Sequence, residues 1–223
     1  MKSIVLSALL GTLLWAGGDV APQRSNDGFY IGAELGLSST KLISGGYNTI
    51  GRFPNTNQDT DIGAFGGINI GYIYNDWRID LAYRAYSKTH YVTDSFRPPN
   101  PTFFYDSDLS VDLYMLSLYY DFGSFGPSNR YSFYGGAGIG SAKADLTTDD
   151  GVVNGSGTDT NFAWQLEAGL DYHYSESLHL YAGIRYVDMG TADIEIGLNG
   201  SGGGNFTAKL RSSEIFTGIR YRF

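Results

Sequence analysis

The chain has 223 residues, of which 31 are glycine and 18 are tyrosine, and it contains no cysteine. This length suits a single domain, and the lack of cysteine excludes a disulfide framework and thiolate metal sites. With 23 acidic and 15 basic residues the formal net charge is −8, so most of the surface would repel a nucleic-acid backbone and no nucleic-acid partner is expected.

The N-terminus has the three parts of a secretory signal peptide. Lys2 supplies positive charge, an apolar segment follows at 4–15, and the small residues of 16–18 suit cleavage. No later apolar run approaches the roughly 20 residues that a membrane helix needs, which excludes a helical membrane protein. We therefore expect a signal peptide at 1–18, an N-terminal extension at 19–27 and one domain at 28–223.

From residue 28 onward the chain alternates between apolar side chains and small or polar ones. In the first run Phe29, Ile31 and Leu35 share one face, while Glu34 and Gly36 share the other. Alternation with a period of two is typical of β-strands with one apolar face. Eight such runs follow in chain order, near 28–38, 61–74, 77–86, 110–122, 131–140, 162–174, 178–186 and 214–223.

The fourth run is the least regular of the eight, because both of its faces contain apolar residues. Leu109, Val111 and Leu113 have one parity. The other parity holds a larger set, which we expect to form the apolar face: Tyr114, Leu116, Leu118, Tyr120 and Phe122.

The connections between the runs alternate in length. Short turns are predicted at 75–76, 123–129 and 175–177, and long polar loops at 41–59, 92–107, 146–161 and 194–206. Short periplasmic turns and long outer loops are the pattern of an outer-membrane barrel. The sequence therefore predicts an all-β fold, an eight-stranded antiparallel up-and-down transmembrane β-barrel with four long extracellular loops.

Aromatic residues indicate which face meets lipid. A soluble lipocalin-like carrier would place its apolar face inside the barrel. Tyrosine and tryptophan suit a membrane interface, because their rings face acyl chains while the hydroxyl or N–H reaches water. Seven of the eight runs contribute to a predicted aromatic ring at the short-turn end, composed of Phe29, Tyr72, Tyr74, Trp77, Tyr120, Phe122, Tyr131, Phe133, Tyr172, Tyr174, Tyr221 and Phe223. This favours the membrane barrel.

The opposite face of the runs contains ionisable groups, which are costly in lipid but can pair inside a barrel. We expect Arg185 to lie between Glu167 and Glu214, with Arg84 reaching Glu34 across the lumen. Eight strands leave an interior that side chains just fill, so this layer would plug the lumen. Structural pairing is the preferred interpretation of these charges, and ion gating is the alternative.

Several segments resemble the outer-membrane β-barrel family of OmpA-like transmembrane domains and opacity-type surface proteins. They are Gly28-Phe29-Tyr30-Ile31-Gly32, the glycine-rich segment 134–140, the segment 164–172 and the C-terminal segment 218–223. The resemblance covers about residues 28–223 and implies the bacterial outer membrane as location. In that family the C-terminal strand is read by the barrel-assembly machinery, and Ile219, Tyr221 and Phe223 fit such a signal. We expect no counterpart of the C-terminal peptidoglycan-binding domain of full-length OmpA-type proteins.

Three classes of function remain open. The long loops favour a structural or adhesin-like role, with outer-membrane lipid and lipopolysaccharide as neighbours and a host or cell-surface ligand as partner. The charged lumen allows a narrow or gated porin-like pore as the alternative. Some barrels of this kind modify lipid A with histidine, serine and an acid, but His173-Tyr174-Ser175 lies at the periplasmic end and His90 lacks such partners, so no enzyme is expected.

No metal and no cofactor are expected either. Three histidines, His90, His173 and His179, are dispersed along the chain. The glycines of 135–140 do not match a dinucleotide fingerprint and are better explained by close packing inside the barrel.

Overall fold

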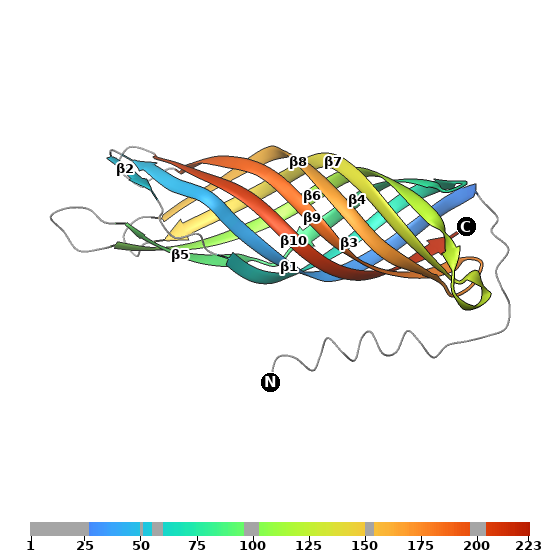
Figure 1. Ribbon diagram of the computed structural model, residues 1–223. Helices are drawn as coiled ribbons and strands as arrows, with labels where there is room; N and C mark the ends of the chain where they lie inside the picture. Colours follow the sequence, from blue (N-terminus) through green and yellow to red (C-terminus); the bar gives the residue numbers. More distant parts are fainter. Residues whose placement is uncertain (1–26, 50, 55–59, 96–102, 150–153, 197–203) are drawn as a thin grey trace, which may run out of the picture.

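The structure is a computed structural model that describes residues 27–49, 51–54, 60–95, 103–149, 154–196 and 204–223 (Figure 1). The expected signal peptide and residues 19–26 of the extension lie outside this part of the chain. The strands are β1 (Asp27–Thr49), β2 (Gly51–Pro54), β3 (Thr60–Tyr74), β4 (Trp77–Tyr86), β5 (Thr89–Ser95), β6 (Phe103–Phe125), β7 (Tyr131–Asp149), β8 (Asn154–His173), β9 (Leu178–Ile196) and β10 (Gly204–Arg222). No helix in these ranges is long and apolar enough to cross a membrane.

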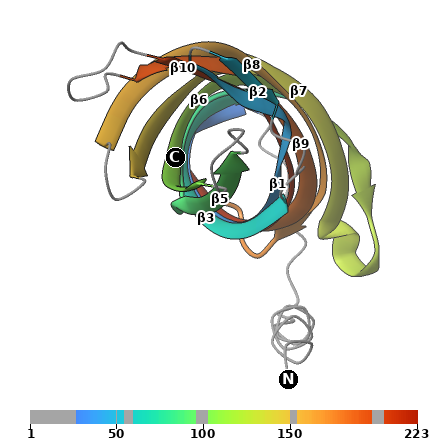
Figure 2. The same ribbon diagram turned by 90° about the vertical axis from the view of Figure 1, so that its left-hand side faces the viewer.

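Eight of these strands form one closed antiparallel ring, as predicted (Figure 2). Each strand pairs with its neighbours along the chain, and β1 also pairs with β10, so that Tyr30 is opposite Gly71 on one side and Arg222 on the other. The two short strands extend the ring at its outer end, because β2 folds back on β1 and β5 continues beyond β4 along β6. Closure leaves the ring without a free edge.

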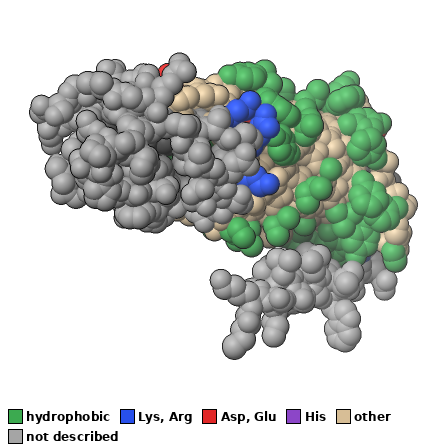
Figure 3. All heavy atoms as spheres, turned by 60° about the vertical axis from the view of Figure 1, so that its left-hand side comes forward, with side chains coloured by type: hydrophobic (Ala, Val, Ile, Leu, Met, Phe, Trp, Pro, Cys, Tyr) green, Lys and Arg blue, Asp and Glu red, His purple; other side chains and the backbone are tan. Residues whose placement is uncertain are grey.

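The outward face carries the apolar side chains that the alternation predicted. Phe29, Leu35 and Ile68 are each more than 60 % exposed, whereas Tyr30, which adjoins Phe29, is fully buried. Hydrophobic side chains cover this part of the surface (Figure 3). At the short-turn end Phe29 packs on Tyr72 and Trp77 packs on Tyr120, each at 4.9 Å between ring centroids. We call this exposed hydrophobic surface the apolar belt.

The ambiguous parity of β6 has a simple structural reason. Tyr114, Leu116 and Leu118 are about half exposed on the outward face, as predicted, while Leu113 and Met115 are fully buried. Both faces of this stretch are apolar because the inward set belongs to a hydrophobic cluster inside the barrel. This cluster comprises Leu109, Val111, Leu113, Met115, Ala142, Ala144, Ala163, Val187, Met189, Ala192 and Leu210.

The predicted loop boundaries are wrong, because the strands continue well beyond the belt. Parts of 41–59, 92–107, 146–161 and 194–206 lie in strands, and β1 and β6 each reach 23 residues. Backbone hydrogen bonds sustain a ladder without an outward apolar face, so the period-two pattern fades while the strand does not. The turn predicted at 123–129 is likewise shorter, since β6 ends at Phe125 and only the 3-10 turn η2 (Pro127–Asn129) separates it from β7.

We call the strand segments beyond the belt the outer collar. They are 41–49 of β1, 103–112 of β6, 141–149 of β7, 154–161 of β8, 188–196 of β9 and 204–211 of β10.

Candidate functional site: the charged lumen

Arg185 on β9 occupies the centre of the lumen between two glutamates from the adjacent strands. The sheet register places it opposite Glu167 on β8 and opposite Glu214 on β10. Its Nε donates to Glu167 Oε2 at 2.7 Å, and its Nη1 donates to Glu214 Oε2 at 3.0 Å. All three side chains are buried. These are the two contacts that the sequence predicted for Arg185.

Glu34 on β1, the strand that pairs with β10, completes this layer. Its Oε2 accepts Nη2 of Arg185 at 3.0 Å, and its Oε1 accepts Nε of Arg84 from β4 at 2.5 Å. The structure therefore brings together all five residues of the predicted network, Glu34, Arg84, Glu167, Arg185 and Glu214. We call these five residues the central layer.

Neutral side chains that sequence reasoning did not single out supply the remaining hydrogen bonds. Tyr86 donates its hydroxyl to Glu214, and Tyr119 and Tyr134 donate theirs to Glu167. Gln165 accepts Nη1 of Arg84 at 2.8 Å. Their inward parity was readable from the sequence, but nothing in a single strand indicates which phenol meets which carboxylate.

A second charged layer lies toward the periplasmic end. Oδ2 of Asp171 accepts Nη1 of Arg220 at 2.6 Å and Nη1 of Arg78 at 3.3 Å, and Arg78 also lies 3.3 Å from Asp121. The guanidinium of Arg220 stacks over Tyr181, 4.9 Å from the ring centroid. Such stacking on aromatic rings suits arginine better than lysine.

The two layers are closely packed against each other. Residues from both, among them Glu34, Arg78, Arg84 and Arg220, enclose a cavity of about 10 Å³. That volume is at the threshold for a single water molecule. At this level the side chains of the described residues leave little free space inside the barrel.

Comparison with known proteins identifies the fold. Residues 7–223 match the family described as the outer membrane protein beta-barrel domain. This chain belongs to that family. It is similar to the outer membrane protein PagN of Salmonella typhimurium, with 25 % identity over 234 residues that cover 91 % of this chain and 93 % of the relative. The protein is therefore located in the bacterial outer membrane.

Solved structures of outer-membrane barrels share the architecture. OprG of Pseudomonas aeruginosa has a TM-score of 0.58 at 16 % identity and covers 92 % of this chain and 99 % of its own. Neisserial surface protein A, NspA, has a TM-score of 0.54 at 21 % identity and covers 87 % of this chain and 97 % of its own. At these identities the likeness concerns the fold alone.

The residues of the expected assembly signal lie on the outside of this outer-membrane barrel. Ile219, Tyr221 and Phe223 alternate along β10 with exposed side chains, and Phe223 N donates to Phe29 O at 3.0 Å where the ring closes. Their side chains are thus accessible on the outward side of the C-terminal segment, away from the charged lumen.

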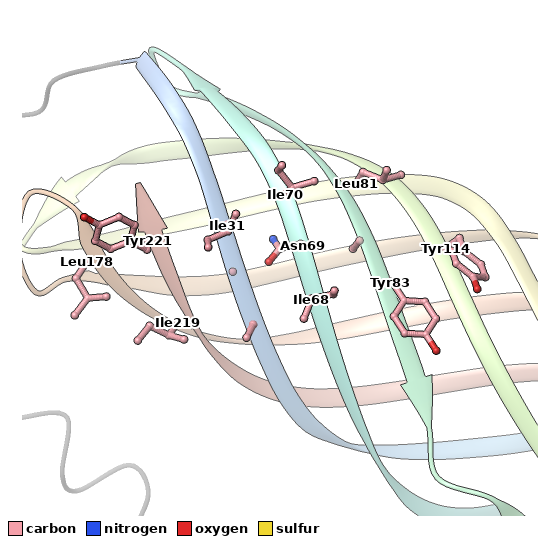
Figure 4. A pocket seen from close by; sticks show the side chains of 13 residues that line it. Ile31, Ile68, Asn69, Ile70, Leu81, Tyr83, Tyr114, Leu178, Ile219 and Tyr221 are labelled. Carbon is pink, nitrogen blue, oxygen red and sulfur yellow. The ribbon is translucent and has the colours of Figure 1, made fainter. Parts of the chain in front are cut away.

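One hollow of the outer-membrane barrel is a shallow trough on its outward face, shown in Figure 4. It measures about 670 Å³ and crosses β10, β1, β3 and β4 between the side chains of Ile219, Ile31, Ile68 and Leu81. Its lining is almost entirely aliphatic and aromatic, and it lies within the apolar belt.

Two of the three histidines that the sequence analysis took as dispersed lie side by side in the folded barrel. His173 and His179 are direct cross-strand partners on β8 and β9, with ring centroids 4.5 Å apart. The side chain of His90 on β5 falls outside those the structure describes. Ser175 of the His173-Tyr174-Ser175 segment accepts the backbone N–H of Leu178 at 3.0 Å, which is a structural use of its hydroxyl within the turn.

Proposed function

We propose that this outer-membrane barrel has a structural and adhesin-like role and that it meets its partners through the outer collar and the segments the collar connects. The observation that carries this proposal is the length of the strands. A strand needs about 9–11 residues to cross the membrane, whereas β6 has 23.

The surplus length extends away from the cell. Ten residues of collar, at roughly 3.3 Å each and a tilt of about 40°, rise about 25 Å above the belt. The collar thus projects clear of the membrane as a hydrogen-bonded support, and rigid supports of this kind commonly present binding loops. The relative NspA is named a surface protein, which supports the same interpretation.

The filled lumen supports this role over the alternative of a pore. Arg84 and Arg185 are bound by carboxylates from three other strands, so opening a passage would require breaking several buried ion pairs at once. We propose that the layers plug the barrel, and that the barrel is neither a catalyst nor a soluble carrier. The barrel-assembly machinery is the partner we propose for Ile219, Tyr221 and Phe223.

Lipopolysaccharide is the lipid partner we propose, on the basis of a basic cluster above the belt. Lys41 of β1 is directly opposite Arg211 of β10, four residues beyond the outward side chains Leu37 and Ile215. This spacing puts the two cations about 10 Å above the belt, at headgroup depth. Figure 3 shows basic side chains at this boundary.

Like charges that face each other across strands are destabilising, so an anion is needed there. Arg211 pairs with Asp188 at 2.8 Å, and among described residues no ion pair is found for Lys41. Phosphates of lipid A would supply the missing charge. Barrels carrying Lys41→Gln and Arg211→Gln should co-purify with less lipopolysaccharide than the wild type, and equal amounts would contradict the assignment.

Shortening the collar in register tests the adhesin-like role. Leu146 and Gly157 are cross-strand partners, as are Ala192 and Ala208. Replacing 147–156 and 193–207 each by Asn-Gly therefore joins paired residues through a turn suited to hairpins. Bacteria producing the wild type should attach to cultured epithelial cells, and bacteria producing the shortened barrel should not.

The heat-dependent gel mobility of folded barrels and surface labelling provide the control for folding and abundance. If the shortened barrel is folded and equally abundant but attachment is unchanged, or if the wild type confers no attachment, the proposal is wrong.

A further inference from the structure

The periplasmic end of the lumen contains three metal-ligating side chains that the fold brings together. Asp171 and His173 point inward from β8 at alternate positions, and His179 lies opposite His173 on β9. One ligand atom from each of the three lies within 4.8 Å of the others. We propose that Asp171, His173 and His179 bind a transition-metal dication, with Zn²⁺ as the best chemical match.

Two of the three ligand atoms are buried and lack a hydrogen bond. Oδ1 of Asp171 and Nδ1 of His179 lie 3.4 Å apart on side chains only 2 % and 8 % exposed. Neither atom has a hydrogen-bond partner among the described residues, in spite of their proximity. Leaving buried polar atoms without a hydrogen bond costs about 1–3 kcal/mol each, and with a neutral imidazole the contact between these two atoms is no ion pair, so a cation bound between them would satisfy both.

The spacing of these two atoms matches a zinc ion placed beside them. Zinc binds histidine nitrogen and carboxylate oxygen at about 2.0–2.1 Å in tetrahedral geometry, which separates two ligands by about 3.4 Å. That is the separation found between Asp171 and His179. His173 is half-buried, and its ligand atom lies within 4.8 Å of those of Asp171 and His179.

The groups around the three ligands orient them as second-shell partners commonly do. Arg220 and Arg78 both bind Oδ2 of Asp171, which leaves Oδ1 directed toward His179. Nε2 of His173 lies 3.2 Å from the hydroxyl of Ser132 on β7, which fixes the plane of the ring.

The same surroundings set the expected affinity and selectivity. The charges of Arg78 and Arg220 oppose a cation, and the carboxylates of Asp171 and Asp121 offset them. Binding should therefore be moderate. Two imidazoles favour Zn²⁺, Cu²⁺ or Ni²⁺, whereas Mg²⁺ and Ca²⁺ prefer sites made of oxygen ligands.

Calorimetric titration of the detergent-folded full-length barrel with Zn²⁺ tests the proposal. The wild type should bind one equivalent, and Mg²⁺ should give no heat. His173→Gln and His179→Gln should each weaken binding by more than the roughly tenfold that loss of a second-shell partner costs. His90→Gln is the matched control and should bind as the wild type does.

Co²⁺ should give the visible absorption of a tetrahedral complex, and this absorption should be lost in the double variant His173→Gln/His179→Gln.

Heat-dependent gel mobility shows whether each variant is folded, and glutamine keeps a polar group at each position. The proposal is overturned if the wild type binds no Zn²⁺ at millimolar concentration. It is equally overturned if the folded double variant binds as tightly as the wild type, because the ion would then be bound elsewhere.

Discussion

Arg185 is the side chain on which the central layer most depends, because it contacts Glu34, Glu167 and Glu214 at once. Replacing it with alanine leaves three buried carboxylates with only Arg84 to balance them. Breaking a buried ion pair by removing one partner costs about 3–5 kcal/mol. We expect Arg185→Ala to lower the free energy of unfolding by an amount of this order, measured by urea denaturation of the barrel in lipid vesicles.

Lys143→Ala provides the comparison for Arg185→Ala. Lys143 pairs with Asp145 at 3.1 Å on the outer surface, where solvent screens the pair, so its loss should change stability little. Equal stability of the two variants would show that the central layer contributes no more than a surface pair.

Gly169 is required because an aromatic ring lies directly over it. A Cβ at this position would come within 2.6 Å of both the Tyr134 ring and the Ala182 carbonyl oxygen. Overpacking of this kind costs about 1–3 kcal/mol, so Gly169→Ala should lower the urea midpoint. At Gly66 the nearest atom is 3.9 Å from the added carbon, and Gly66→Ala should be neutral or slightly stabilising. A Gly169→Ala barrel as stable as Gly66→Ala would contradict the packing argument.

At the scale of strands, the sequence predicted the segments that form the apolar belt and missed the strand segments that continue beyond it. Where Phe29 and Leu35 face lipid and Glu34 faces the lumen, alternation located the strand and its faces correctly. Beyond the belt the alternation in the sequence fades while the backbone ladder continues, so segments such as 41–49 and 154–161 were taken for loops. The parity of the strands likewise put Glu167, Arg185 and Glu214 inside the barrel. Which tyrosines donate hydrogen bonds to the two carboxylates depends on the register between strands, which a single strand does not show.

The collar has a seam between β8 and β9 that Asp159 bridges. In the described chain the ladder between these strands ends at Trp164 and Asp188. Beyond it, Asp159 accepts the backbone N–H of Asp193 at 2.7 Å and that of Thr160 at 2.8 Å. The hydrogen bond from Asp193 is the main reason that the pKa of Asp159 lies below its usual range.

A lowered pKa means that the stabilisation by Asp159 is complete above the ordinary aspartate value of about 3.9 and is lost as the pH falls through the lower folded value. The amide proton shift of Asp193, followed by NMR in micelles, should titrate with a midpoint below about 3.9. Asp159→Asn should abolish this titration. A midpoint at or above the ordinary value would show that the seam is not bridged by the ionised carboxylate.

At the scale of the whole barrel, the two charged layers and the hydrophobic cluster fill one continuous interior. The register places Arg84 opposite Leu113, so the cluster of Leu109, Val111, Leu113 and Met115 begins where the central layer ends and continues toward the collar. Ions would have to cross an apolar section as well as the buried ion pairs. Both sections oppose conduction, since desolvated ions are costly in apolar surroundings.

Planar bilayers test this closure directly. We expect the wild-type barrel to give no unitary current above the background of the lipid, and Arg185→Ala to stay silent as well, because the hydrophobic cluster remains in place. A large porin inserted under the same conditions shows that the assay detects channels. Stable unitary steps from the wild type that change with Arg185→Ala would instead make the central layer a gate, and the surface role would then have to be shared with transport.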